Sequence, residues 1–188
     1  MIHLATFMPE YFNNNGDQGN IEVLARQLEW RGVKCSVSST DHSDSDFLLV
    51  GDGSRAVMRE FESELSGITE LLQKRLETGK ATLLVGSAHE YFCSKLTGLP
   101  ELKTVARVSE FRKVSAGGQT VFGYRNTDKD VDLFINKAFV STTLFGPVLA
   151  NNQDLLNLML SAMGVSGELP EQQQSRLNTL VEAIQSKA

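Results

Sequence analysis

A turn of small residues between a predicted strand and a predicted helix is the part of this chain most suggestive of chemistry. The apolar run 81–85 meets Gly86, Ser87 and Ala88, and a helix-compatible stretch follows. Several hydrolase families use a sharp turn of this kind to expose a nucleophilic Ser or Cys. The apex here is a glycine, so Ser87 is the candidate nucleophile and His89 the candidate general base.

Structural roles offer a simpler explanation for the same side chains. Ser87 and Glu90 have the spacing of a capping box, in which the Ser caps the helix N-terminus. His89 lies too far along the turn to face its apex, so we expect a surface or partly packed imidazole. Cys93 and Cys35 are expected to be buried, inert thiols, the first on a helix and the second in a strand.

Two acidic segments offer weaker candidates. Asp17, within GDQGN, is expected to cap the first helix or to line a ligand-binding rim. His42 lies among three Asp residues in TDHSDSD (40–46), but neither a fixed ligand geometry nor a suitably placed glycine accompanies them. We interpret that segment as a solvated loop, and we expect no metal site and no cofactor.

The bulk properties predict a single soluble domain, residues 1–188, in the cytoplasm. A chain of 188 residues is long enough for one substantial core. Its formal net charge of −5 supplies no basic field for nucleic acid or an anionic membrane, so we expect neither as a partner. Only two cysteines and no long apolar run occur, which favours a reducing compartment and argues against secretion or membrane spanning.

Apolar runs and turn residues divide the chain into alternating strands and helices. Strands are predicted at 2–7, 33–37, 46–51 and 81–85, and helices at 20–32, 54–78 and 89–96, the second either continuous or broken near Gly67. This alternation predicts an α/β fold, a three-layer α/β/α sandwich around a mostly parallel sheet. Extra strands, some antiparallel, are predicted in 103–145. Two helices, 152–163 and 171–186, end the chain, and the apolar stripe of the second predicts that it packs on the body.

Four glycine-bearing loops follow the predicted strands. They are 8–20, 50–55, 85–90 and 143–148. Ligands of an open parallel sheet bind beyond the carboxyl ends of its strands, so these loops are expected to form one rim. In two of these loops, at Gly51 to Gly53 and at Gly86 to Ser87, backbone N–H groups could face an anion or oxyanion, although lone glycine pairs also form simple tight turns. The expected rim residues are Asp17, Gly51, Gly53, Ser87 and Glu90.

Four stretches, in this order, resemble one family. They are NNNGDQGNIEVLARQLEWRG (13–32), FLLVGDGSR (47–55), ATLLVGSAHEYF (81–92) and STTLFGPVLANNQDLLNLML (141–160). Together they resemble class I glutamine amidotransferase domains of the cobyric acid synthase type, including GatD, the glutaminase subunit of lipid II isoglutaminyl synthase. The resemblance implies a flavodoxin-like core and a Mur-ligase-like or other amidoligase partner.

Both positions that match the family's catalytic pair are changed in this chain. The family's cysteine falls on Gly86, and its histidine falls on Phe145. Glutamine hydrolysis in the family needs a thiolate to attack the amide and an imidazole to move the proton, and neither residue supplies one. The resemblance therefore implies a degenerate domain, a pseudoenzyme that binds or regulates a ligase-type partner or holds a small ligand at the rim.

Two other functions stay open at this point. The chain could be an active amidotransferase or hydrolase that uses relocated residues such as Ser87, or an unrelated flavodoxin-like or DJ-1-like α/β protein. One geometric relation separates these alternatives. If the match is right, Gly86 and Phe145 should meet across the rim, with the aromatic ring making the site drier.

Overall fold

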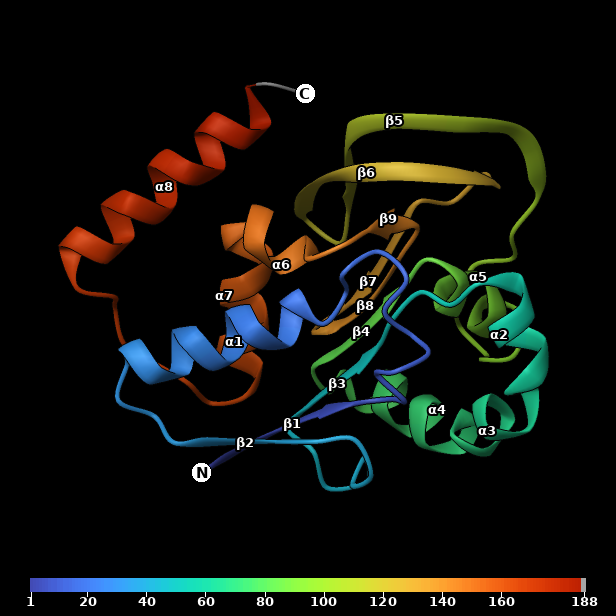
Figure 1. The fold of residues 1–188 in the computed structure, drawn as a ribbon, viewed down its shortest axis with the longest axis horizontal. Coiled ribbons are helices and arrows are strands. Elements are labelled where there is room, and N and C mark those ends of the chain that lie inside the picture. The colour runs from blue at the N-terminus through green and yellow to red at the C-terminus, as the bar shows by residue number, and fades with distance from the viewer. Residues whose placement is uncertain (187–188) are drawn as a thin grey trace.

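A six-stranded sheet forms the centre of the molecule in the computed structural model, which describes residues 1–186 (Figure 1). In spatial order its strands are β2 (Cys35–Ser38), β1 (Ile2–Thr6), β3 (Phe47–Val50), β4 (Thr82–Val85), β8 (Phe139–Thr142) and β7 (Leu133–Asn136). The first five are parallel, and β7 runs antiparallel to β8. Strands β3 and β4 are buried along their whole length because helices cover both faces, which explains their wholly or almost wholly apolar sequences.

Helices pack on both faces of this sheet, so the predicted three layers are present (Figure 1). One face carries α1 (Gly19–Trp30), α6 (Val148–Asn151) and α7 (Gln153–Ala162). The other carries α2 (Arg55–Glu60), α3 (Glu62–Gly67), α4 (Thr69–Thr78) and α5 (Ser87–Cys93). Each face has its own apolar cluster, and neighbouring residues of β3 point into different clusters, Leu49 into the first and Leu48 into the second.

A second, antiparallel sheet accounts for the extra strands predicted in 103–145. It consists of β5 (Thr104–Ala116), β6 (Gln119–Lys129) and β9 (Leu144–Phe145). Gly117 and Gly118, both with positive φ, form the two-residue turn between β5 and β6. Because β6 pairs with β9, with Tyr124 opposite Phe145, this sheet holds the segment that carries Phe145 at the carboxyl end of the central sheet.

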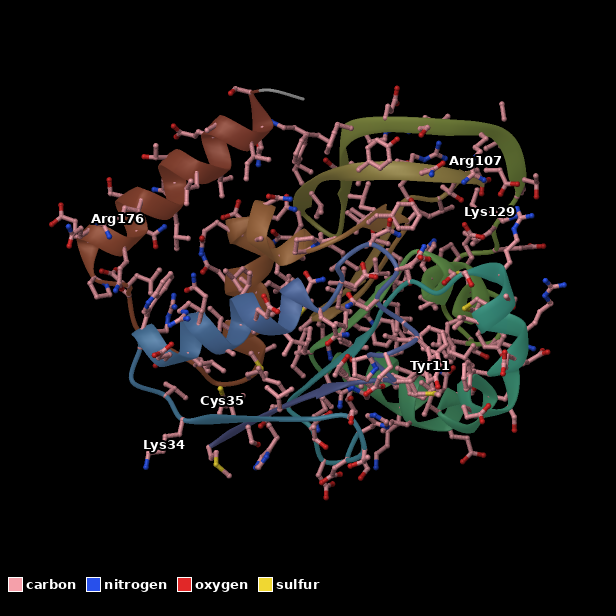
Figure 2. The ribbon with its side chains drawn as sticks, in the orientation of Figure 1. Tyr11, Lys34, Cys35, Arg107, Lys129 and Arg176 are labelled. Atoms are coloured by element: carbon pink, nitrogen blue, oxygen red, sulfur yellow. The ribbon has the colours of Figure 1, made fainter. Side chains whose placement is uncertain are left out.

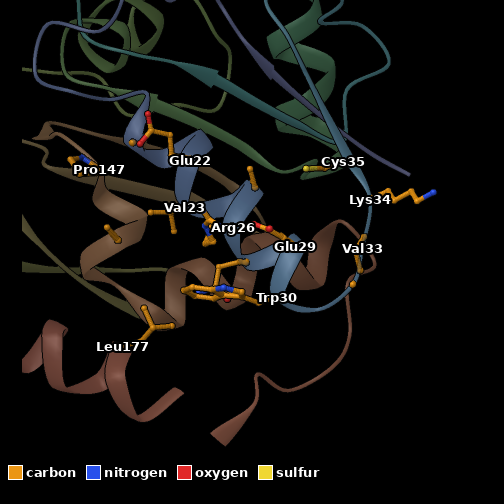
Figure 3. Close-up of a pocket in the computed structure, with 15 residues that line it drawn as sticks. Glu22, Val23, Arg26, Glu29, Trp30, Val33, Lys34, Cys35, Pro147 and Leu177 are labelled. Atoms are coloured by element: carbon orange, nitrogen blue, oxygen red, sulfur yellow. Dashed lines mark hydrogen bonds and ion pairs between the residues drawn. The ribbon is translucent and has the colours of Figure 1, made fainter. Parts of the chain in front are cut away.

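The last helix, α8 (Glu171–Gln185), contacts the body at α6 but packs on it less closely than predicted, and Leu177 and Val181 of its apolar stripe are half-buried. None of its residues is buried, and Leu180 and Ile184 of its apolar stripe are 60% and 44% exposed. A cavity of about 990 Å³ lies between α8 and α1, where Leu177 and Trp30 are among the lining residues (Figure 3). The sequence periodicity shows where the apolar residues of α8 lie, but it carries no information on whether a complementary surface exists. No helix within residues 1–186 is long and apolar enough to cross a membrane.

Candidate functional site

The turn Val85–Ser87, hereafter the elbow, joins β4 to α5 at the carboxyl edge of the sheet. Its apex, Gly86, has φ 59° and ψ −119°, a backbone conformation that favours glycine. The N–H of Gly86 donates to the carbonyl of Thr142 over 2.8 Å, which fixes the elbow to β8. The sharp strand-to-helix turn expected from the sequence is therefore present.

Two side chains fill the space above the elbow. A Cβ atom built on Gly86 would lie 2.5 Å from Oδ1 of Asp52 and 2.7 Å from Cε1 of Phe145. Gly86 and Phe145 therefore meet across the rim, as the match to the family requires. Any side chain at position 86 would have to displace a carboxylate and an aromatic ring.

Asp52 is the residue of this site that the sequence did not indicate. Its Oδ1 accepts a 2.8 Å hydrogen bond from the backbone N–H of Ser87. Its Oδ2 accepts bonds of 3.1 and 2.8 Å from the side-chain amides of Asn14 and Asn15. The carboxylate thus connects the loop after β1 and the loop after β3 to the elbow. The sequence feature that could have indicated Asp52 is its position as an acidic residue between Gly51 and Gly53.

Ser87 bonds to a neighbouring loop and does not cap its helix. Its hydroxyl accepts a 2.8 Å bond from the N–H of Gly53, whereas the N-cap of α5 is Gly86 and makes no side-chain cap bond. Glu90 accepts from the hydroxyl of Thr127 instead of reaching back. The predicted capping box is therefore wrong, because the amide of Gly53, far away in sequence, takes the hydroxyl that would have capped the helix.

Both amides expected to face an oxyanion are consequently occupied. The amide of Ser87 holds the Asp52 carboxylate, and the amide of Gly53 holds the Ser87 hydroxyl. In acyl-transfer sites such amides must be free for the oxygen that becomes negative during the reaction. In this chain, one of them already binds an anion that belongs to the protein.

The comparisons with known proteins bear on the fold. No family model matches the chain, and no curated protein matches its sequence. A solved glutamine amidotransferase from Thermotoga maritima matches with a TM-score of 0.51 at 13% identity, over 97% of this chain and 89% of that chain. The chain has a glutamine amidotransferase-like fold. A second solved glutamine amidotransferase has a TM-score of 0.46 at 17% identity, over 86% of this chain and 99% of that chain.

Within this amidotransferase-like fold, a cavity of about 600 Å³ opens beside the elbow. Its lining residues are Gly53, Arg55, Met58, Arg59, Ser87, Glu90, Tyr91 and Lys129. Three of the expected rim residues thus line one cavity. The other two, Asp17 and Gly51, are buried and are not among its lining residues, and the space beside Gly51 is closed by the carbonyl of Phe12.

His89 is buried in the amidotransferase-like core, contrary to the predicted surface or partly packed position. Its Nδ1 lies 2.7 Å from the hydroxyl of Ser141, and its Nε2 lies 3.1 Å from the carbonyl oxygen of Val131. Burial lowers the pKa of His89 from 6.5 to about 4, so the ring is neutral at neutral pH. Both ring nitrogens are engaged, and neither is available as a base for Ser87.

Cys93 lies beside His89 but does not form an activated pair with it. Its Sγ is 3.7 Å from Nδ1 and 3.8 Å from Nε2, so the sulfur is equally far from both nitrogens and in line with neither. Burial raises the pKa of the Cys93 thiol to about 12, which keeps it protonated. The predicted inert thiol is what the geometry supports. Cys35, by contrast, is only half-buried.

Asp17 neither caps α1 nor lines an open rim. The N-cap of α1 is Gln18, and it makes no side-chain cap bond. The Asp17 carboxylate is fully buried and accepts bonds from the backbone N–H groups of Asp52 (2.9 Å) and Gly146 (3.2 Å). It therefore joins the loop before α1 to the loop after β3 and the turn after β9. Burial, with a smaller contribution from the Asp52 charge, raises the pKa of Asp17 from 3.8 to about 6.

Clustered metal ligands are absent from the described part of the chain. No group of three or more His, Cys, Asp or Glu side chains in residues 1–186 could hold a metal ion. In the acidic loop at 40–46, the ring of His42 packs against Phe7, with ring centroids 5.6 Å apart. Its Nε2 lies 3.4 Å from the carbonyl oxygen of Thr6, so this imidazole is engaged with β1 and with the loop that follows it.

Proposed function

We propose that this chain is a glutamine amidotransferase-like domain of the cobyric acid synthase and GatD type that does not hydrolyse glutamine. It acts instead as a binding or regulatory partner of a ligase-type protein. The observation that carries this proposal is the filled elbow. The Asp52 carboxylate and the Phe145 ring occupy the space that a side chain at position 86 would need.

Hydrolysis of glutamine through a covalent intermediate needs three things: a nucleophile, a base and unoccupied oxyanion donors. Gly86 supplies no nucleophile, and Phe145 supplies no group that takes up a proton. The amide of Ser87 already bonds the carboxylate of Asp52. A fixed negative charge at this point repels the oxyanion of the transition state, so the site disfavours the reaction at each step.

A hydrolase based on Ser87 finds no support in the same geometry. The Ser87 hydroxyl accepts from the Gly53 amide, and the imidazole of His89 is engaged with Ser141 and the carbonyl of Val131. Nucleophilic serines need a base within hydrogen-bonding reach to remove their proton. The other buried pair, His89 and Cys93, combines a neutral ring with a protonated thiol.

The proposed partner follows from the resemblance of four ordered stretches to a family whose members work with ligases. The experiment mixes the purified chain with a candidate Mur-ligase-like protein, and size-exclusion chromatography and ammonia release from glutamine are both measured. The proposal expects co-elution without ammonia. Steady ammonia release that the Ser87→Ala variant abolishes would replace it with an active hydrolase. Separate elution of the two proteins would remove the ligase from the proposal.

A further inference from the structure

The cavity beside the elbow has an excess of positive charge. Arg55 and Arg59 reach it from α2, and Lys129 reaches it from β6, whereas Glu90 is its only acidic lining residue. The chain as a whole carries a formal net charge of −5, so this local excess is opposite in sign to the average surface. Such a concentration of one sign in a concave site raises the local concentration of small anions.

The two arginines have no carboxylate partner of their own. Among residues 1–186, no salt bridge involves Arg55 or Arg59, and the Nε of Arg59 donates to the carbonyl of Arg55 over 3.2 Å. Like charges four positions apart on a helix repel each other. A bound anion would relieve this repulsion, and two guanidinium groups suit the paired oxygens of a phosphate.

The remaining lining residues complete the site. The Ser87 hydroxyl accepts from the Gly53 amide and keeps its own proton available for donation to a ligand. Lys129 is positioned by two groups: its Nζ lies 3.0 Å from the hydroxyl of Thr104 and 3.4 Å from the carboxylate of Asp128. The ring of Tyr91 and the side chain of Met58 supply an apolar wall next to these polar groups.

We propose that this cavity binds the phosphate group of a small organic ligand. Arg55, Arg59 and Lys129 hold the phosphate, and the organic part lies against Tyr91 and Met58. Lys129 is already paired with Asp128, so the two arginines without a carboxylate partner are the main phosphate ligands, because their paired N–H donors match the oxygens of a phosphate. The inference rests on the proposed function, because an elbow without a nucleophile would leave the bound ligand intact.

The test is isothermal titration calorimetry of the purified full chain with phenyl phosphate at low ionic strength. We expect one saturable site, whose dissociation constant rises about tenfold or more in Arg59→Ala and in Arg55→Ala, since each removes a charge-assisted contact. Arg59→Lys keeps the charge but not the paired donors, so its dissociation constant should lie between those of the wild type and Arg59→Ala. Arg176→Ala is the matched control, because Arg176 on α8 lies across the molecule from Lys129 (Figure 2).

Further arms of the titration identify the ligand chemistry. Inorganic phosphate should bind more weakly than phenyl phosphate, because it cannot use the apolar wall, and L-glutamine should not compete. Absence of saturable binding, binding unchanged in Arg55→Ala and Arg59→Ala, or equal affinity for inorganic phosphate and phenyl phosphate would overturn the inference. A failure of the proposed function would be seen in a separate assay, as release of ammonia from glutamine. Circular dichroism confirms that the variants fold.

Discussion

The carboxylate of Asp52 lies 2.8 Å from the backbone N–H of Ser87, directly above the apex of the elbow. The protein thus places its own anion where an amidotransferase with an open elbow would accommodate a reacting oxygen. The Asp52 carboxylate and the Phe145 ring thus both crowd the apex of the elbow. The predictions below test what this arrangement does.

Introducing a Cys at position 86 and a His at position 145 should not by itself produce glutaminase activity. In a Gly86→Cys, Phe145→His variant, the new Cβ still lies 2.5 Å from Oδ1 of Asp52, and the carboxylate disfavours a thiolate beside it. We expect no ammonia from glutamine until Asp52→Gly is added as a third change. The control is Asp52→Gly alone, which should be inactive. Activity in the double variant would show that Asp52 does not block the elbow.

Crowding at the elbow should appear as a loss of stability when a methyl group is added. Gly118→Ala is a matched control, because Gly118 also has positive φ, 77°, but nothing lies within 4 Å of an added Cβ. We expect about 1 kcal/mol for the control and about 1–3 kcal/mol more for Gly86→Ala, measured by denaturant unfolding. Equal costs for the two variants would mean that Asp52 and Phe145 yield freely.

The buried carboxyl of Asp17 should make stability fall as pH rises. Its pKa is raised in the folded state to about 6 from 3.8, so the folded state holds the proton more tightly than the unfolded state. The contribution of Asp17 to the free energy of unfolding is complete below about pH 4. It falls between about pH 4 and pH 6, and the loss is at most about 3 kcal/mol. The free energy of unfolding of the wild type minus that of Asp17→Asn should follow this fall. A flat difference would contradict it.

His89 should produce the opposite slope. Burial lowers its pKa in the folded state to about 4 from 6.5, so the unfolded state binds the proton more tightly. Its contribution is complete above about pH 6.5 and is lost as pH falls toward 4. The difference in unfolding free energy between the wild type and His89→Gln should therefore shrink on acidification. A flat difference would contradict this, because a solvated imidazole has the same pKa in the folded and unfolded states.

The fold was predictable because its signals are local. Apolar runs such as 81–85, bounded by Gly and Ser, predict buried parallel strands, and the turn after that run predicted the elbow. The meeting of Gly86 and Phe145 also followed from the order of the matching stretches. The helix predicted at 54–78 is three helices: the break expected near Gly67 is present at Ile68, whereas the break at Phe61 carries no glycine or proline as a signal.

The contacts that decide the site were not predictable, because their partners are distant in sequence. Asp52 bonds the amide of a residue 35 positions later, and Ser87 takes the amide of a residue 34 positions earlier. A capping box is a purely local pattern, so the sequence favoured it for Ser87. His89 looked exposed for the same reason, since Ser141, its buried partner on β8, lies 52 positions away.

Ammonia release from glutamine by the unaltered chain, with and without a Mur-ligase-like partner, tests the central claim most directly. The filled elbow predicts release no faster than from glutamine in buffer alone, under both conditions. Steady turnover that either Ser87→Ala or Cys93→Ala abolishes would contradict the claim, because it would show that a nucleophile acts despite the Asp52 carboxylate and the Phe145 ring.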